Sequence, residues 1–342
     1  MTRATSILRT AITGLLLSLT GEATANLTVA ARSTLLEATP LVVAIQDYYA
    51  NASSPSDIDA AKIGPATFIN GLPDLWDNPT LDLDAGAEVH VLHDAPHHPD
   101  LRVITTVSEV FYRIVGAKSS GIISDPSSLK GKKIGVVLNS TSAYFAYRYL
   151  KEIAQLDETE YTLVGARGIC YALPCANNSF PEMLRRGEID AVTAYEPTTE
   201  LTIQSLGAEN VVVFRNDSLY RELSVMYTTQ SRLDDPVTRK RIVQFLRVLE
   251  KVQSVFQNQP EQIWGRVSEI TASGASAKTL GDVWPLTRWT GGIPHDMVDI
   301  LYEEDKWISK DVTLGRGPMT RERVASHVYS GVLEEARALG PL

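Results

Sequence analysis

Cysteine and positive charge are both scarce in this chain. Two cysteines in 342 residues exclude a disulfide scaffold and a zinc or iron–sulfur centre with several thiolate ligands. The 32 Lys and Arg residues face 41 Asp and Glu residues, so the formal net charge is −9. Such a balance argues against nucleic acid or an anionic membrane surface as a partner, because both attract clustered positive charge. A small anionic ligand stays open, since one local site can oppose the overall sign.

Long hydrophobic runs are missing as well. The apolar stretch from Ala11 to Leu19 is far shorter than the roughly 20 residues that span a bilayer. It follows Arg3 and Arg9 and precedes Ala23-Thr24-Ala25, which is the order of a secretory signal with an A-x-A cleavage site. We therefore predict that residues 1–25 are a signal peptide. The mature chain would be secreted or periplasmic, without insertion into a membrane.

Export would place the two cysteines in an oxidising compartment. We expect Cys170 and Cys175 to form a disulfide there, on a loop. Five N-x-S/T sequons occur, at Asn26, Asn51, Asn139, Asn177 and Asn216. They favour a secreted eukaryotic protein, but a bacterial periplasmic source stays open. We expect glycans on Asn51, Asn177 and Asn216.

Strand and helix patterns alternate from residue 27 to residue 214. Strands are predicted at 27–30, 101–107, 132–138, 161–164, 189–193 and 211–214. Helices are predicted at 40–49, 85–92, 142–155, 180–187 and 197–206. This alternation is typical of an α/β fold with parallel sheets covered by helices. After about residue 234 only helices are expected, at 236–256, 260–271, 294–309 and 320–338.

The most informative segment runs from Gly121 to Leu150. Here a buried strand leads into a Ser/Thr-rich turn that opens a helix. The free N–H groups of a first helical turn, with the hydroxyls of Ser140, Thr141 and Ser142, can hold a small anion. The simpler interpretation is that Ser142 only caps its helix. The spacing of these residues alone does not distinguish an anion site from a capped helix.

Four motifs follow one another in order along the chain. They are HPDLRVITTVSEVFYRIVGAKSSGI at 98–122, DPSSLKGKKIGV at 125–136, STSAYF at 140–145 and LRRGEIDAVTAYEP at 184–197. Together they resemble the solute-binding proteins of ABC importers, in the nitrate/sulfonate/taurine branch that also includes the hydroxymethylpyrimidine-precursor synthases. The similarity extends over about residues 26–330.

The resemblance implies a two-lobed, type 2 periplasmic-binding-protein-like fold. Each lobe would be a mostly parallel sheet flanked by helices, and the C-terminal part would be helical. The expected division is residues 1–25 as signal peptide, 26–113 with 226–342 as lobe one, and 114–225 as lobe two. Two chain crossings, near 112–118 and 222–229, would form the hinge.

The resemblance also implies a ligand site in the cleft between the lobes. The residues that it assigns from lobe one are Arg32, Ser33, Asp84, Ala85, Gly86 and Glu88. Those from lobe two are Ser140, Thr141, Ser142, Tyr144, Tyr195 and Glu196. A glycan on Asn139 would crowd this cleft, because that sequon directly precedes the expected anion cradle.

The predicted function is that of an exported solute-binding protein. It would capture a small ligand, expected to be anionic and similar to a sulfonate, nitrate or a pyrimidine. A secreted interaction protein that keeps the fold is one alternative. An enzyme similar to the pyrimidine-precursor synthases is another, although this sequence lacks the CCCFC cluster of the eukaryotic enzymes.

Neither a cofactor nor a metal is expected. His90, His93, His97 and His98 lie close together in the sequence, but His98-Pro99-Asp100 matches a turn of the family, so we interpret the cluster as structural. We expect a monomer that binds a small molecule, with an ABC permease as a further partner if the source is bacterial.

Overall fold

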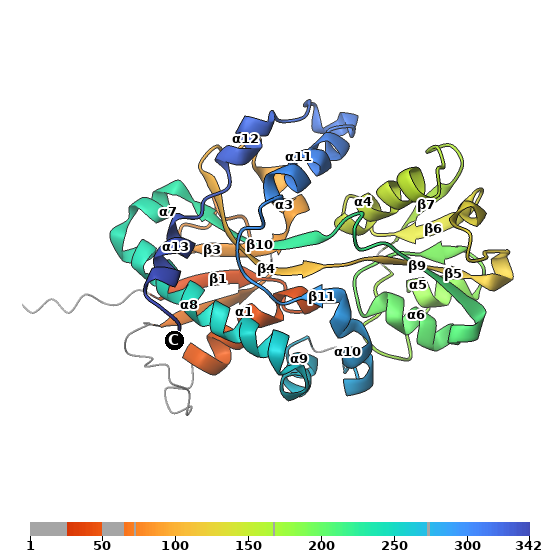
Figure 1. The fold of residues 1–342 in the computed structure, drawn as a ribbon, viewed down its shortest axis with the longest axis horizontal. Helices are drawn as coiled ribbons and strands as arrows, with labels where there is room; N and C mark the ends of the chain where they lie inside the picture. The colour runs from red at the N-terminus through yellow and green to blue at the C-terminus, as the bar shows by residue number, and fades with distance from the viewer. Residues whose placement is uncertain (1–25, 50–64, 72, 167, 272–273) are drawn as a thin grey trace, which may run out of the picture.

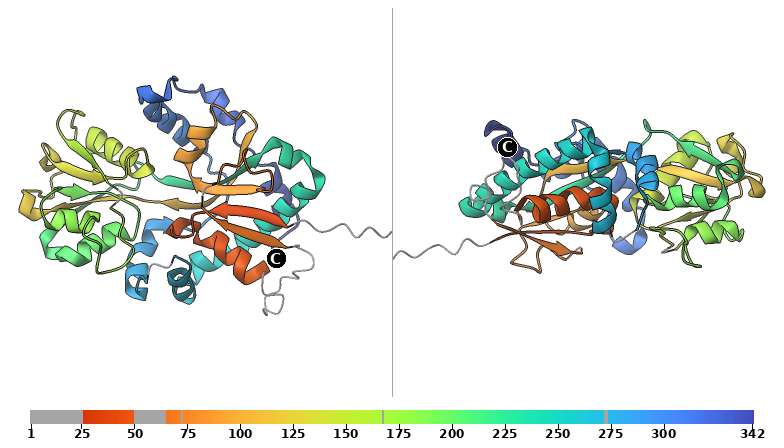
Figure 2. Two further views of the ribbon diagram at one scale, coloured as in Figure 1. Left: turned by 180° about the vertical axis from the view of Figure 1, so that it is seen from behind. Right: turned by 90° about the horizontal axis from the view of Figure 1, so that it is seen from below.

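The strands of the chain form two separate sheets. The computed structural model describes residues 26–49, 65–71, 73–166, 168–271 and 274–342, so the predicted signal peptide and Asn51 lie outside it. The order in the first sheet is β11 (Thr287–Arg288), β4 (Leu101–Val110), β10 (Glu222–Thr229), β3 (Leu83–Ala87), β1 (Leu27–Ala31) and β2 (Ala66–Asn70). The order in the second is β7 (Thr162–Gly165), β6 (Lys133–Val136), β8 (Ala191–Val192), β5 (Arg113–Ala117) and β9 (Val211–Arg215). Each sheet is the centre of one lobe, and the lobes lie side by side (Figures 1 and 2).

Both sheets are mixed, and the path of the chain explains why. β1 is parallel to β2 and β3, and β6 is parallel to β7 and β8. The chain enters the second sheet directly from β4 to β5 and returns directly from β9 to β10. Because the two crossings run in opposite directions, β10 is antiparallel to β4 and β5 is antiparallel to β9. The predicted two-lobed α/β fold is confirmed, but the prediction of mostly parallel sheets was wrong, because the strands next to the crossings pair antiparallel.

Helices cover both faces of the first sheet, because its strands carry apolar side chains on both faces. On β4, Leu101 and Val103 face one core, whereas Ile104 and Val107 face the other. The first core is closed by α3 (Glu88–Asp94), α11 (Met297–Ile308) and α12 (Arg321–Ser326). The second is closed by α1 (Thr39–Val43), the π-helix η2 (Ala44–Tyr49), α7 (Gln230–Asp234), α8 (Pro236–Asn258), α9 (Trp264–Ile270), α10 (Ala277–Val283) and α13 (Gly331–Ala338).

The longest helix, α8, has the capping and the apolar face that its sequence predicts. Asp235 accepts a hydrogen bond from the Thr238 N–H at 2.7 Å, and Pro236 occupies the first position. The buried face is Ile242, Val243, Phe245, Leu246, Val248, Leu249, Val252, Gln253 and Phe256. This helix anchors the C-terminal part of the chain to the first sheet (Figure 1).

The second lobe is smaller and has two cores. Helix α4 (Thr141–Arg148) and the π-helix η5 (Tyr149–Ile153) pack on one face of its sheet. Helices α5 (Phe180–Arg185) and α6 (Thr198–Leu206) pack on the other. Short 3-10 helices connect elements in both lobes: η1 (Leu36–Ala38), η3 (Lys118–Ser120), η4 (Pro126–Leu129), η6 (Ala208–Asn210), η7 (Pro260–Gln262), η8 (Trp284–Leu286) and η9 (Val312–Leu314).

Three predictions about local structure were wrong. The expected helix at 85–92 begins as strand β3, because Ala85 and Gly86 pair with β10 and short apolar runs do not distinguish a strand from a helix. A strand does occur after residue 234, since β11 pairs with β4. The expected helix at 320–338 is divided in two, because the chain between α12 and α13 hydrogen-bonds to both sides of Val103.

The strands place the two crossings at residues 111–112 and 216–221. The predicted lobe boundary after residue 113 falls close to the first crossing. The boundary after residue 225 falls inside β10, which belongs to the first sheet over its whole length. No helix in the described part of the chain is both long and apolar enough to cross a membrane.

Candidate functional site

Residues from both lobes meet around the two crossings. Tyr112 lies on the first crossing and Tyr220 on the second, while Glu222 opens β10. Helix α4 of the second lobe begins at Thr141, which lies at this junction. Helix α11 of the first lobe lies next to α4 (Figure 1). The Tyr144 and Trp307 rings, 5.2 Å apart, join these two helices.

A carboxylate lies at the centre of the junction. Glu222 is fully buried, and its Oε2 accepts hydrogen bonds from the Thr141 hydroxyl at 2.6 Å and from the Tyr112 hydroxyl. The Tyr112 and Thr141 hydroxyl oxygens are themselves 2.8 Å apart. The other oxygen, Oε1, is buried without a hydrogen-bond partner among the described residues. The hydroxyl at the start of α4 is therefore engaged by a carboxylate of this chain.

Two further carboxyl groups lie nearby, both contributed by the first lobe. Glu88, at the start of α3, accepts hydrogen bonds from the Tyr220 hydroxyl at 2.6 Å and from the Leu223 N–H at 3.0 Å. Glu304, on α11, is fully buried, and its carboxyl group hydrogen-bonds to that of Glu88, which requires one of the two to be protonated. We call Glu88, Glu222 and Glu304 the junction carboxyls.

The junction carboxyls hold protons more readily than exposed carboxylates do. Burial raises the pKa of Glu304 to about 8; a hydrogen bond with Glu88 opposes this rise, and repulsion from Glu222 adds to it. Burial also raises the pKa of Glu88, with repulsion from Glu304 and Glu222 as further causes. Burial raises the pKa of Glu222 too, although hydrogen bonds from Thr141 and Tyr112 oppose the rise. At neutral pH the junction therefore shares protons among its acidic groups.

Glu37 extends the acidic character of the junction on the other side. It lies in η1 of the first lobe and is buried, and burial raises its pKa to about 8. Repulsion from Glu222 is the next cause of this rise.

Ser140, Thr141 and Ser142 lie at the start of α4, as predicted for the anion cradle, but their hydroxyl groups hydrogen-bond to other groups of this chain. Ser140 donates to the Val137 carbonyl at 2.6 Å, and its oxygen lies 2.9 Å from that of Ser142. Ser140, rather than Ser142, is the N-cap of α4, and no side-chain hydrogen bond caps the helix. Ser140, Thr141 and Ser142 are all buried.

The other residues assigned to the second lobe divide into two groups. Tyr144 and Tyr195 lie at the junction: the Tyr144 ring is 5.0 Å from that of Tyr220, and the Tyr195 ring is 6.4 Å from that of Tyr112. Glu196 instead forms an ion pair with Arg113 at 2.9 Å, inside the second lobe.

The residues assigned to the first lobe are more widely spread. Glu88 lies at the junction, as described above. Asp84 is buried within the first sheet and accepts hydrogen bonds from the Tyr227 hydroxyl at 2.9 Å and the Ala85 N–H at 2.8 Å. Gly86 pairs with Val225 of β10. Arg32 and Ser33, just after β1, lie at the surface end of the sheet; Arg32 is exposed, and the Ser33 N–H donates to the Asn70 side chain at 3.0 Å.

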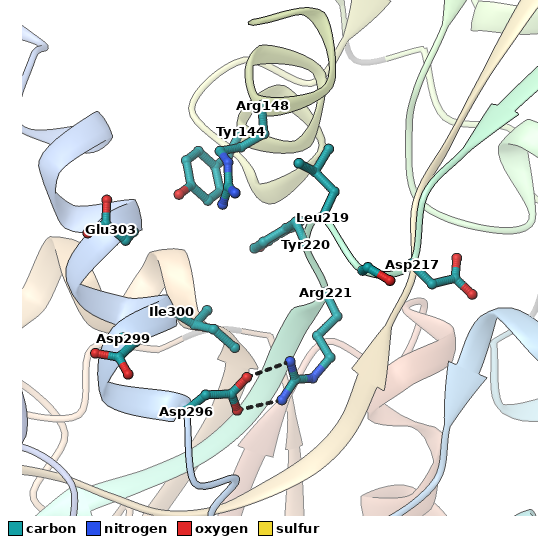
Figure 3. A pocket seen from close by; sticks show the side chains of 11 residues that line it. Tyr144, Arg148, Asp217, Leu219, Tyr220, Arg221, Asp296, Asp299, Ile300 and Glu303 are labelled. Atoms are coloured by element: carbon teal, nitrogen blue, oxygen red, sulfur yellow. Dashed lines mark hydrogen bonds and ion pairs between the residues drawn. The ribbon is translucent and has the colours of Figure 1, made fainter. Parts of the chain in front are cut away.

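A cavity of about 210 Å³ opens at the edge of the junction, between the two lobes. Figure 3 shows Tyr144 and Arg148 of α4 on one side and Ile300 and Glu303 of α11 on the other. Tyr220 also lines this cavity while its hydroxyl binds Glu88, so its ring connects the cavity to the junction carboxyls. At the far end Arg221 forms a two-fold ion pair with Asp296, with distances of 2.7 and 3.0 Å.

The disulfide predicted from the sequence is present. Cys170 and Cys175 are bonded at 2.01 Å, on a loop of the second lobe. The predicted glycosylation sites differ in surroundings: Asn177 is exposed, whereas the Asn216 side chain accepts a hydrogen bond from the Ser218 N–H at 3.0 Å on the second crossing. Asn139 is exposed and has a positive φ of 54°. Glycosylation at these sites stays a prediction.

Sequence reasoning missed most of the junction carboxyls and their partners. Glu222 and Glu304 were not expected at the site, nor were Tyr112 and Tyr220. One signal was available: Glu304 follows Met297 and Leu301 at helical spacing, so it lies in the apolar stripe of its helix. A carboxylate in that position is costly unless it serves a purpose.

Comparison with known proteins identifies the family of this chain. The family model described as NMT1/THI5 like matches residues 87–263, more than half of the chain. This chain belongs to the NMT1/THI5-like family. The family resemblance read from the four sequence motifs is thereby confirmed. No curated protein matches the chain.

Solved structures with this fold include binding proteins and an enzyme. The periplasmic aliphatic sulphonate binding protein SsuA from Escherichia coli has a TM-score of 0.66 at 14% identity, covering 87% of this chain and 96% of that one. The periplasmic nitrate-binding protein NrtA from Synechocystis PCC 6803 has a TM-score of 0.61 at 11% identity, covering 92% and 88%. A mutant of the desulfurization enzyme DSZB, in complex with biphenyl-2-sulfinic acid, has a TM-score of 0.60 at 13% identity, covering 92% and 99%. At these identities the likeness shows the fold alone.

Proposed function

We propose that this chain is an exported solute-binding protein that captures a small ligand in a cleft between its two lobes. The fold it shares with SsuA and NrtA, which bind sulfonates and nitrate, supports this assignment. The single observation that carries the proposal is the buried polar contact at the junction. There Glu222, at the head of a strand in the first sheet, meets Thr141 at the start of a helix in the second lobe.

A polar contact of this kind suits lobes that separate and close again. Buried hydrogen bonds between lobes are exchanged for hydrogen bonds to water or to a ligand when the lobes part, so their net contribution is small. A dry apolar interface would hold the lobes together more firmly. Since residues 111–112 and 216–221 are the only connections between the sheets in the described part of the chain, rotation about these crossings would open the junction.

The ligand would contact residues from both lobes in the closed state. From the predicted set we retain Glu88, Ser140, Thr141, Ser142, Tyr144 and Tyr195, and we add Tyr112, Tyr220, Glu222 and Glu304. Asp84 and Glu196 are less suited to this role, because each is satisfied inside its own lobe. The predicted negative charge of the ligand is not part of this proposal, since the junction itself is acidic.

Catalysis with a cysteine nucleophile does not fit the chain, although DSZB is an enzyme with this fold. The sequence contains two cysteines, and both are in the disulfide, so no thiolate can form. We therefore propose binding rather than catalysis. Export through the signal at 1–25, a monomeric state and, in a bacterial source, docking to an ABC permease belong to the same proposal.

The decisive experiment is to recover the ligand and to observe closure. Protein purified from its natural source would be analysed by native mass spectrometry, and the released small molecule identified. A matched sample, freed of ligand by unfolding and refolding, would be compared by small-angle X-ray scattering before and after the ligand is returned. We expect a bound small molecule and a smaller radius of gyration on rebinding. A natural sample without any small molecule, and scattering that never changes, would refute the proposal in favour of an interaction protein.

A further inference from the structure

A groove of about 530 Å³ lies between α4 and η5 of the second lobe and α11 of the first lobe. We call it the α4–α11 groove. Four cations and two acids line it: Arg148, Lys151, Lys306 and Lys310, with Glu152 and Glu303. The chain as a whole has a net charge of −9, so the positive charge of this groove opposes the overall sign. A local excess of this kind favours an anion.

One cation of the groove has no carboxylate partner. The other three do: Arg148 pairs with Glu152, Lys306 with Glu303 and Lys310 with Glu158. Lys151 is exposed, and within the described residues its ammonium group contacts the hydroxyl and the ring of Tyr147 alone. The pair of Lys310 with Glu158 is long, at 3.4 Å, and both side chains are exposed, so it contributes little. Lys151 and Lys310 are therefore the cations that the chain itself neutralises least.

These two lysines come from different lobes and converge on one hydroxyl group. Lys151 of the second lobe donates to the Tyr147 hydroxyl at 3.1 Å, and Lys310 of the first lobe donates to it at 3.0 Å. The two ammonium nitrogens therefore lie within two hydrogen-bond lengths of each other. Like charges this close repel, and here the repulsion acts across the boundary between the lobes. An anion bound to both would replace that repulsion by attraction.

Tyr147 and Trp307 complete the groove. Burial raises the pKa of the Tyr147 hydroxyl, but hydrogen bonds from Lys310 and Lys151 outweigh burial and lower it. A neutral hydroxyl cannot neutralise two ammonium groups, whereas an oxyanion accepts stronger, charge-assisted hydrogen bonds from them. Beside these charges the half-buried Trp307 ring, 6.2 Å from that of Tyr147, offers an apolar surface to the organic part of a ligand.

We propose that the α4–α11 groove binds an organic phosphate monoester, with the phosphate group between Lys151 and Lys310 and the organic part against Trp307. A phosphate monoester carries roughly −1.5 to −2 at neutral pH, which matches the excess of positive charge in the lining. None of the junction carboxyls lines this groove, so the inference goes beyond the proposed function and does not depend on the solute at the junction. Because the ligand would contact both lobes, it would favour their closed arrangement.

Matched probes test the charge and the organic part of the ligand separately. The full chain would be titrated in a calorimeter with phenyl phosphate, benzenesulfonate, inorganic phosphate and benzyl alcohol. We expect phenyl phosphate to bind at one site per chain and to raise the melting temperature. Benzenesulfonate keeps the ring but carries one charge, and inorganic phosphate lacks the ring, so each should bind less tightly. Benzyl alcohol, which has no charge, should not bind.

Variants locate the site. Lys151→Gln and Lys310→Gln should each weaken phenyl phosphate binding about threefold to tenfold, since each removes one charge-assisted hydrogen bond at an exposed position. Lys240→Gln, an exposed change on α8, alters the net charge equally and should leave the affinity unchanged. Lys151→Glu should abolish binding and yet melt at a higher temperature than Lys151→Gln, because its carboxylate would attract Lys310 across the lobe boundary.

Each other outcome overturns the inference. Equal affinity for phenyl phosphate and benzenesulfonate would show that the groove does not select a phosphate group. Equal affinity of the unaltered chain and of both glutamine variants would place the phosphate elsewhere. Several weakly bound phosphates per chain, or the same loss of affinity in Lys240→Gln, would show general attraction to surface lysines. The proposed function would stand in every case, because it is tested by the solute recovered from the natural source.

Discussion

Two groups of buried carboxylates in this chain differ in how their charge is compensated. In the second lobe, Glu196 and Glu200 are paired with one guanidinium, that of Arg113, at 2.9 Å each. At the junction, Glu88, Glu222 and Glu304 are buried at least as deeply, and their hydrogen-bond partners are hydroxyl groups, one backbone N–H and a neighbouring carboxyl group. The first group is an ion-pair network that stabilises one lobe. The second is a set of acids with no cation between two lobes.

The comparison of these two groups indicates which buried acidic residues have a functional role. Burial of an acidic group says little when a cation within the same lobe satisfies it, because the protein alone accounts for the arrangement. Burial without a cation, between bodies that can separate, raises the pKa of an acid and marks a candidate functional site. Three predictions follow from this contrast, from the largest effect to the smallest.

Removing Arg113 should have the largest effect. Arg113→Met leaves Glu196 and Glu200 buried without a cation, and we expect the free energy of unfolding to fall by about 3–5 kcal/mol. Urea unfolding at neutral pH measures this loss. The triple variant that also carries Glu196→Gln and Glu200→Gln should recover most of it. A loss well below 1 kcal/mol in Arg113→Met would show that the contrast between the two groups is false.

Removing the Thr141 hydroxyl should have an intermediate effect. Thr141→Val keeps the shape but deletes the donor to Glu222, and we expect a loss of about 1–3 kcal/mol in unfolding free energy. In a Glu222→Gln background the same change should cost less, because a neutral acceptor depends less on the donor. A double-mutant cycle measures this coupling. Equal costs in both backgrounds would mean that Thr141 does not act through the carboxylate.

Changing Glu304 should mainly alter the pH dependence of stability. Its pKa is raised from the ordinary 4.5 to about 8 in the folded chain, so the folded state holds the proton more tightly than the unfolded state. This contribution to stability is fully present below about pH 4.5 and is lost as the pH rises to about 8. In Glu304→Gln, unfolding curves recorded from pH 5 to pH 8 should therefore show a smaller loss of stability with rising pH. An unchanged slope would show that Glu304 is not the group responsible.

Much of the fold could be predicted from local pattern. The strand-to-helix turn at Ser140, the capped helix after Asp235 and the disulfide each depend on residues close in sequence, and each is present. The errors fall where distant pairing decides the structure. Ala85 and Gly86 have no local preference for a strand and take one because β10 lies alongside.

The site was predicted less completely than the fold, for a related reason. Motifs identified Thr141, Tyr144, Tyr195 and Glu88, which lie at the junction, but they could not show what those residues contact. The same motifs suggested an anion at Thr141. The structure instead places the Glu222 carboxylate there, from a position 81 residues further along the chain.

The sequence by itself determined the α/β alternation, the acidic balance, the disulfide pair and the family, because composition, local spacing and ordered motifs carry that information. Only the tertiary structure decided which acids are compensated. Arg113 meets Glu196 across 83 residues, and Tyr220 meets Glu88 across 132. The charge environment of a buried group is set by neighbours that the fold brings together, and the Coulomb energy depends on distance in space rather than along the chain.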